Sequence, residues 1–124
     1  MREWSVRGHG TNVIVDITLD RSALRTLHSR MAAYVYIMSN KRYGTIYVGV
    51  TSDIVRRAWE HREGIYPGFT DRYGLHDLVW YEVHESIIDA IEREHAMKHW
   101  PRRWKTALVD AMNPQWEDLF PGLI

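Results

Sequence analysis

Residues 34–50 (YVYIMSNKRYGTIYVGV) place two short runs of strand-forming residues on either side of a polar loop. Valine, isoleucine and tyrosine dominate residues 34–38 and 45–50, and these residue types favour β-strands. The intervening residues 39–44 include serine, asparagine and glycine, which are common in turns. The pattern predicts a β-hairpin, so the fold must contain at least one antiparallel pair of strands.

The register of this hairpin decides which side chains meet across it. If Met38 pairs with Thr45 across the six-residue loop, Tyr36 lies directly opposite Tyr47, with Cβ atoms about 5 Å apart. Tyr34 would then lie opposite Gly49, which leaves room on that face because glycine has no side chain. For two isolated tyrosines, an aromatic pair in the core is the simplest explanation. Chemistry by their hydroxyl groups is the alternative.

Capping and helix-breaking residues divide the rest of the chain. TSD at 51–53 offers N-cap residues for the next helix, and Pro101 separates the last two helices. The predicted elements are strands at 34–38, 45–50 and 78–83, and helices at 53–63, 86–99 and 101–111. The order β-β-α-β-α-α predicts a small α/β (α+β) domain with one sheet and helices packed on it.

The first 31 residues differ from the remainder. TNVIVDITL at 11–19 alternates apolar and polar or smaller residues, which predicts a strand, and DRSALRTLHSR at 20–30 could form one or two helical turns. No strong hairpin or capping signal ties either segment to the hairpin at 34–50. We therefore expect 1–31 to be a dispensable N-terminal extension, 32–120 to be the functional domain and 121–124 to be a tail.

Composition excludes several classes of function. The chain has no cysteine, which excludes disulfides, thiolate chemistry and cysteine-based zinc sites. Lys+Arg and Asp+Glu each number 16, so any contact with nucleic acid must depend on a local basic patch rather than on net charge. No apolar run approaches the roughly 20 residues of a membrane span, and no secretory signal core is evident. We expect a cytoplasmic protein without a membrane partner.

Two pairs of residues follow helical spacing in the helix after the hairpin. Arg57 and His61 are four residues apart and therefore share one face. Arg56 and Glu60 share the neighbouring face and are expected to form an exposed ion pair. A solvated helix face explains Arg57 and His61 most simply. The alternative is an arginine that binds phosphate through its planar fork, with a histidine beside it.

Glu94 departs from the apolar pattern of the helix at 86–99. Helical periodicity places Glu94 in the middle of the apolar stripe, whereas Glu92 falls on the solvent side. A carboxylate directed at a core is unfavourable unless it is paired or binds a metal. Two explanations stay open: an ion pair with an arginine such as Arg57, or ligation of Mg²⁺, which takes few protein oxygens and keeps several waters.

Two further groups of side chains come after Glu94. His95 and His99 have a spacing that can bind zinc, but no third ligand is evident. KHWPRRWK at 98–105 is a basic segment interleaved with two tryptophans. A solvated helix start explains it most simply, and contact with a phosphate backbone is the alternative. The candidate phosphate-binding residues are Lys98, Arg102, Arg103 and Lys105.

The order of these motifs resembles that of the GIY-YIG endonuclease family. The resemblance is greatest to its small, single-domain bacterial branch, related to the nuclease domain of the excision-repair incision subunit. Segments 69–82 and 113–119 are also similar to this branch, and the resemblance covers roughly residues 33–120. The matching positions are Tyr34–Tyr36 (YVY), Tyr47–Gly49 (YVG), Arg57, His61 and Glu94.

This resemblance implies a three-stranded, mainly antiparallel sheet flanked by helices, and a divalent-metal-dependent endonuclease that hydrolyses DNA phosphodiester bonds. Glu94 would hold Mg²⁺ or Mn²⁺, and Arg57 would stabilise charge on the phosphoryl oxygens. Tyr36 would activate the attacking water. Because an unperturbed tyrosine titrates near pH 10, it would need help from a nearby cation. Tyr47 would orient the site and His61 would assist proton movement.

The resemblance also implies DNA as the partner, in branched, flapped or nicked form, with a structure-specific role in repair or recombination and targeting by another protein. Two positions depart from the family pattern. Val50 stands where many relatives carry a lysine, and Lys105-Thr106 stand where excision-repair relatives carry an asparagine, with Asn113 further along. A non-catalytic nucleic-acid-binding or interaction module on the same fold is the alternative function.

Overall fold

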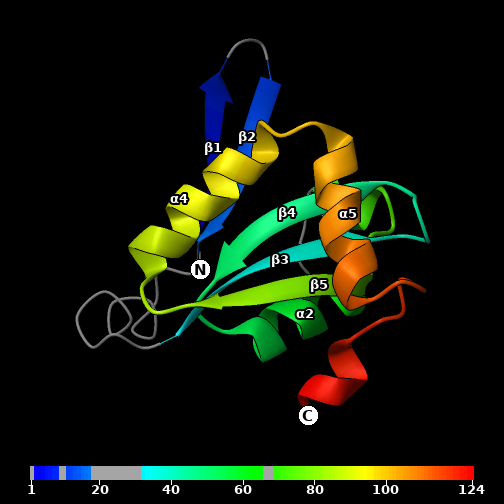
Figure 1. Ribbon diagram of the computed structural model, residues 1–124. Coiled ribbons are helices and arrows are strands. Elements are labelled where there is room, and N and C mark those ends of the chain that lie inside the picture. The colour runs from blue at the N-terminus through cyan, green and yellow to red at the C-terminus, as the bar shows by residue number, and fades with distance from the viewer. Residues whose placement is uncertain (1, 9–10, 18–31, 66–68) are drawn as a thin grey trace.

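Three antiparallel strands form the central sheet in the order β4–β3–β5 (Figure 1). The computed structural model describes residues 2–8, 11–17, 32–65 and 69–124. The three strands are β3 (Ala33–Ser39), β4 (Ile46–Thr51) and β5 (Asp77–His84). The predicted three-stranded antiparallel sheet is confirmed, and each strand extends the predicted run by one residue or shifts it by one.

Helices pack on both faces of this sheet, which confirms the predicted α+β class and the β-β-α-β-α-α order (Figure 1). The main helices are α2 (Ile54–Arg62), α4 (Ile87–Lys98) and α5 (Arg102–Met112). Two short elements, the helix α3 (Phe69–Arg72) and the 3-10 helix η1 (Phe120–Leu123), were not predicted, because single turns carry too little periodicity. None of the described helices is long and apolar enough to span a bilayer.

Local capping explains where the helices begin. The Asp53 side chain accepts a hydrogen bond from the backbone N–H of Arg56 at 3.1 Å, so Asp53 is the N-cap of α2, as the sequence predicts. Ser86 caps α4 in the same way through the N–H of Asp89 at 3.1 Å. Pro101 immediately precedes α5, where its missing N–H costs nothing.

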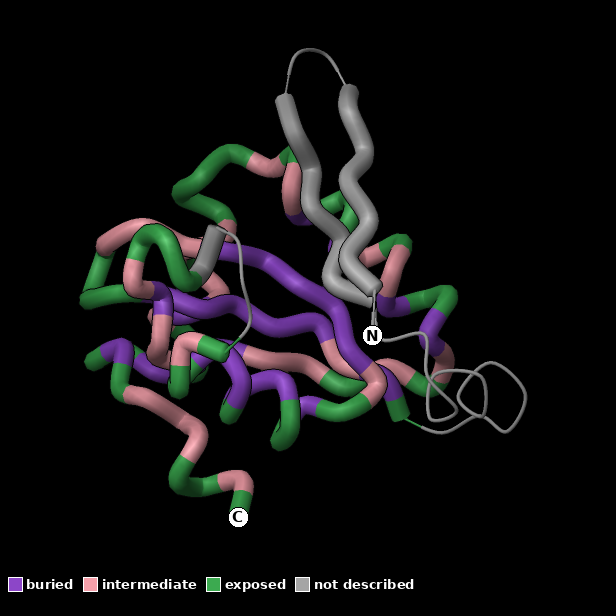
Figure 2. The backbone as a smooth tube through the Cα atoms, turned by 180° about the vertical axis from the view of Figure 1, so that it is seen from behind, coloured by how far each residue is buried: buried purple, intermediate pink, exposed green. Residues whose placement is uncertain are grey.

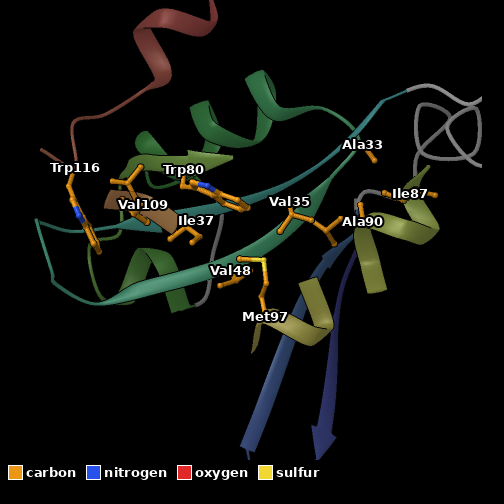
Figure 3. Close-up of a cluster of buried hydrophobic side chains, with 12 residues drawn as sticks. Ala33, Val35, Ile37, Val48, Trp80, Ile87, Ala90, Met97, Val109 and Trp116 are labelled. Carbon is orange, nitrogen blue, oxygen red and sulfur yellow. The ribbon is translucent and has the colours of Figure 1, made fainter. Parts of the chain in front are cut away.

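Alternation along the strands divides the side chains between two clusters. Val35, Ile37 and Val48 point toward α4 and α5 and form the main apolar core with residues such as Met97 and Val109 (Figure 3). The intervening residues point to the opposite face and pack against α2. These are Tyr36, Met38 and Tyr47, which cluster with Ile54 and Ala58 of α2. Strands β3 and β4 are therefore buried along most of their length (Figure 2).

The observed hairpin register differs from the predicted one by two residues. Tyr36 pairs with Gly49 and Met38 pairs with Tyr47, so the predicted direct pairing of the two tyrosines is wrong. Tyr34 pairs with Thr51 rather than with Gly49. A shift of two residues preserves the face of every side chain, because side chains alternate with a period of two. Both tyrosines consequently remain on the α2 face.

Gly49 gives the Tyr36 ring the space it occupies. An ideal Cβ at Gly49 would lie 2.5 Å from both Cζ and the hydroxyl oxygen of Tyr36. Real Cβ atoms do not approach other heavy atoms so closely, and the obstacle is a ring in a buried cluster rather than a flexible side-chain end. Gly49, in the motif Tyr47–Gly49, is therefore needed to make room for the ring of Tyr36, in the motif Tyr34–Tyr36.

We predict that Gly49→Ala lowers the free energy of unfolding by about 1–3 kcal/mol, because the Tyr36 ring must move out of a packed position. The measurement is equilibrium denaturation by urea. Gly122→Ala is the matched control, since a Cβ at Gly122 meets no heavy atom within 4 Å. Equal stability of the two variants would contradict the steric argument.

A second, two-stranded sheet lies outside the central one. Strands β1 (Arg2–Gly8) and β2 (Thr11–Ile17) pair antiparallel, and β2 lies against β4 and α4 (Figure 1). The strand predicted at 11–19 is confirmed over Thr11–Ile17, whereas β1 was missed because its charged residues obscure the alternation. The helical turns predicted at 20–30 lie outside the described residues.

We predict that a fragment comprising residues 32–124 still unfolds cooperatively. The apolar core cluster draws on residues between Ala33 and Trp116, and β2 is not hydrogen-bonded into the central sheet. Thermal unfolding followed by circular dichroism, together with an assay of DNA cleavage, compares the fragment with the full chain. A large loss of melting temperature or activity would show that residues 1–31 are not dispensable.

Candidate active site

A buried hydrogen bond between Tyr36 and His61 lies at the centre of the candidate site. The Tyr36 hydroxyl oxygen is 3.0 Å from His61 Nε2, and the two ring centroids are 5.7 Å apart. Tyr36 reaches this position from the middle of β3, and His61 reaches it from the last turn of α2. A hydrogen bond between a phenol and an imidazole provides a path along which a proton can move.

Tyr47 completes an aromatic triangle with these two residues. Its ring centroid lies 6.3 Å from that of Tyr36 and 5.8 Å from that of His61. The tyrosines are diagonal neighbours across the hairpin rather than direct partners. The structure thus brings together the two tyrosines and the histidine that the motifs singled out, by a different register from the predicted one.

Arg57 and His61 occupy the buried face of α2. Each is only 1% exposed, so the simple interpretation of a solvated helix face is wrong. Glu60 was expected in an exposed ion pair, but it is 5% exposed and its Oε1 lies 3.6 Å from Arg57 Nη1. Arg56 is exposed. The sheet buries more of this short helix than its polar sequence suggests, because the helix packs across the tyrosine face.

Glu94 is fully buried on α4, as its position in the apolar stripe predicts. Its Oε1 lies 2.9 Å from the Lys98 ammonium, one helical turn further along. Glu94 thus forms an ion pair with Lys98, a partner that was not predicted from the sequence. The same ammonium lies 5.1 Å from the centroid of the Tyr47 ring, which is cation–π distance. Lys98 thus links the Glu94 carboxylate to the tyrosine cluster.

The Glu94 carboxylate could hold a metal ion that takes few ligands from the protein. Among the described residues, no group of three or more histidines, cysteines or carboxylates could hold a metal ion. Mg²⁺ commonly binds proteins through one or two carboxylates and retains several waters, so the fully buried carboxylate of Glu94 fits such an ion. His95 and His99 lie close together, with ring centroids 4.9 Å apart, but both are exposed.

A basic cluster continues from Lys98 onto the first turns of α5. Burial lowers the pKa of Lys105 from its ordinary 10.5, and the nearby charges of Arg102 and Lys98 lower it further. Arg103 is exposed. Arg102 is exposed as well, but its Nη2 donates a hydrogen bond to the Tyr43 carbonyl at 3.0 Å, which anchors α5 to the hairpin loop. The positive charges of Lys98, Arg102 and Lys105 therefore repel one another.

Val50, which departs from the family pattern, lies away from the tyrosines. Val50 packs in the main core, on the sheet face opposite Tyr36 and Tyr47. Asn113 has a structural role, because its amide nitrogen donates to the carbonyls of Val79 at 3.0 Å and Glu117 at 2.7 Å. The cation beside the tyrosine cluster is supplied instead by Lys98.

Two features of the site were not recognised from the sequence. The sequence predicts that Lys98 contacts phosphate and that Glu60 is exposed, whereas the Lys98 ammonium pairs with Glu94 and Glu60 is buried. The four-residue spacing of Glu94 and Lys98 is the signal that could have revealed their pairing. No comparable sequence signal separates Glu60 from an exposed glutamate, since only helix packing buries it.

Comparison with known proteins gives a consistent set of similarities. The family described as GIY-YIG catalytic domain matches residues 32–107. UPF0213 protein BH0048 of Halalkalibacterium halodurans is 34% identical over 88 residues, covering 71% of this chain and 93% of the relative. UPF0213 protein SSP2268 of Staphylococcus saprophyticus is 30% identical over 76 residues, covering 61% and 92%. The solution NMR structure of UPF0213 protein BH0048 from Bacillus halodurans has a TM-score of 0.45 and 33% identity, covering 71% of this chain and 93% of that one.

We predict that Lys105→Met increases the free energy of unfolding at pH 7. The folded-state pKa of Lys105 lies below 10.5, so the folded protein binds fewer protons at this position than the unfolded chain, and its charge opposes folding at neutral pH. The wild-type protein should therefore gain stability as pH rises toward 10.5, and the variant should lack this gain. Denaturant titrations at pH 7 and pH 10 measure both effects. The exposed Lys41, replaced by Met, is the control.

Proposed function

The chain belongs to the GIY-YIG family of nuclease domains, and from this premise we propose that it is a divalent-metal-dependent endonuclease that hydrolyses DNA phosphodiester bonds. The single observation that carries the proposal is the burial of the Glu94 carboxylate beside the tyrosine–histidine cluster, to which Lys98 connects it. Packing alone gives no reason for a carboxylate at this position, whereas hydrolysis of a phosphodiester with a divalent ion requires one.

Tyr36 and His61 would move the proton of the attacking water. In the tautomer protonated at Nδ1, His61 accepts the Tyr36 phenolic proton at Nε2 across the 3.0 Å hydrogen bond. The Tyr36 oxygen then takes a proton from a water molecule as that water attacks phosphorus. This arrangement reduces the need for a strongly acidic tyrosine, because the histidine receives the proton that the tyrosine gives up.

Glu94 would hold Mg²⁺ or Mn²⁺, which when bound neutralises phosphate charge and stabilises the leaving oxygen. Arg57 would direct its guanidinium at the phosphoryl oxygens, where its fixed fork stabilises the charge of the transition state. Its burial beside Glu60 holds the side chain in place before substrate arrives. Tyr47 would fix the positions of its ring neighbours Tyr36 and His61.

DNA is the substrate that this family implies, and the basic cluster is the surface proposed to receive its backbone. Lys98, Arg102, Arg103 and Lys105 would contact phosphates, which positions the strand without reading its sequence. We also propose that the substrate is branched, flapped or nicked DNA and that the protein acts in repair or recombination. We further propose that the protein is cytoplasmic and that a partner protein directs it to its substrate. One short domain has little surface for reading bases, which supports this last point.

We predict that Glu94→Gln and Tyr36→Phe each reduce cleavage of nicked, flapped or branched DNA by about 100-fold or more. Glutamine cannot bind a hard cation as a carboxylate does, and phenylalanine has no hydroxyl to transfer a proton. Cleavage is measured by gel electrophoresis of labelled substrates with Mg²⁺, with Mn²⁺ and with chelator. Glu92→Gln is the matched control, because Glu92 is exposed on the opposite side of the same helix.

Full activity of Glu94→Gln would refute the assigned role of this carboxylate. DNA binding without metal-dependent cleavage in the wild-type protein would instead favour the alternative function, a non-catalytic nucleic-acid-binding or interaction module. The exposed and half-buried basic residues of α5 would serve such a module equally well. It gives no account, however, of the buried carboxylate and the tyrosine–histidine hydrogen bond.

A further inference from the structure

Lys98 is largely buried, although lysine side chains usually keep their charged end in water. Its side chain is only 12% exposed, its ammonium lies 2.9 Å from Glu94 Oε1, and it stands over the Tyr47 ring. The long aliphatic stem allows the ammonium to reach other positions without moving the helix. Lys98 also acts electrostatically on Lys105, so it belongs both to the carboxylate site and to the basic cluster.

The Lys98 ammonium competes for the carboxylate that the proposed function assigns to a divalent ion. Two cations at one carboxylate repel each other strongly in a poorly hydrated environment. In the described part of the chain, Glu94 does not belong to a group of three carboxylates or histidines that would outweigh this repulsion. We therefore expect the ammonium to weaken the binding of a divalent ion to Glu94 in the free protein.

We propose that Lys98 is a displaceable counter-ion of Glu94, which keeps the carboxylate charged and in place in the free protein and moves to a backbone phosphate when nucleic acid binds. This inference rests on the proposed function for the identity of the two ligands. The phosphate replaces the carboxylate as the partner of the ammonium, and Glu94 becomes available to the divalent ion. Nucleic acid and divalent ion then bind cooperatively, and each strengthens the other by the same factor.

The first test measures binding of Mn²⁺ alone to the free, full-length protein by electron paramagnetic resonance. We expect Lys98→Met to bind Mn²⁺ about tenfold more tightly than wild type, within the range typical of coupled sites. Lys98→Arg keeps the charge and should bind as weakly as wild type. Adding Glu94→Gln to Lys98→Met should remove the gain. Arg42→Met, which removes one exposed positive charge from the hairpin loop, is the control for net charge.

The second test measures the same Mn²⁺ affinity in the presence of a DNA duplex with hydrolysis-resistant phosphorothioate linkages, after the Mn²⁺ bound by the duplex alone is measured and subtracted. Wild type should bind Mn²⁺ about tenfold more tightly with DNA than without it, whereas Lys98→Met should gain little. If Lys98→Met fails to fold, Lys98→Gln replaces it in both tests, because glutamine also removes the positive charge. Unchanged Mn²⁺ affinity in Lys98→Met, or no effect of DNA on wild type, would overturn the inference.

These outcomes are distinct from those that test the proposed function. Wild-type cleavage together with unchanged Mn²⁺ affinity in Lys98→Met refutes the counter-ion role and leaves the nuclease proposal intact. Tighter Mn²⁺ binding in Lys98→Met, together with DNA-dependent Mn²⁺ binding but no cleavage, supports the counter-ion role and refutes the nuclease proposal.

Discussion

The buried carboxylate of Glu94 imposes the strongest constraint on this small domain. Removing one partner from a buried ion pair typically costs about 3–5 kcal/mol, whereas replacing the pair by apolar residues is often neutral or favourable. An apolar side chain would fill the same helix face next to Ala90 and Met97 without needing a counter-ion. Stability therefore does not explain Glu94 and Lys98, and this is the reason for proposing a chemical role for the pair.

The central sheet separates the tyrosines from the main apolar core. Side chains alternate across β3 and β4, so the apolar residues hold α4 and α5 on one face while the tyrosines meet α2 on the other. β4 is an edge strand, and Lys98 reaches the ring of Tyr47 from the last turn of α4. Lys98 thus connects Glu94, which is buried on the core-facing side of α4, with the tyrosines on the opposite face of the sheet.

The sequence predicted the helices and strands of the central domain well, because residues close together in the chain determine where each one begins and ends. Asp53 caps its helix through its own side chain, and the glycine and polar residues of the loop favour the hairpin. Register was predicted wrongly because the loop length alone did not fix it. The decisive contact, the Tyr36 ring over Gly49, is formed across the hairpin and is visible only in three dimensions.

The sequence by itself determined the element order, the face of each tyrosine and the burial of Glu94, because these depend on periodicities of 2 and 3.6 residues. Only the tertiary structure decided that His61 bonds to Tyr36, that Glu60 is buried and that Lys98 bridges Glu94 and Tyr47. Periodicity fixes the direction of a side chain relative to its own element. The partner it meets depends on how the helices pack against the sheet, which involves residues far apart in the chain.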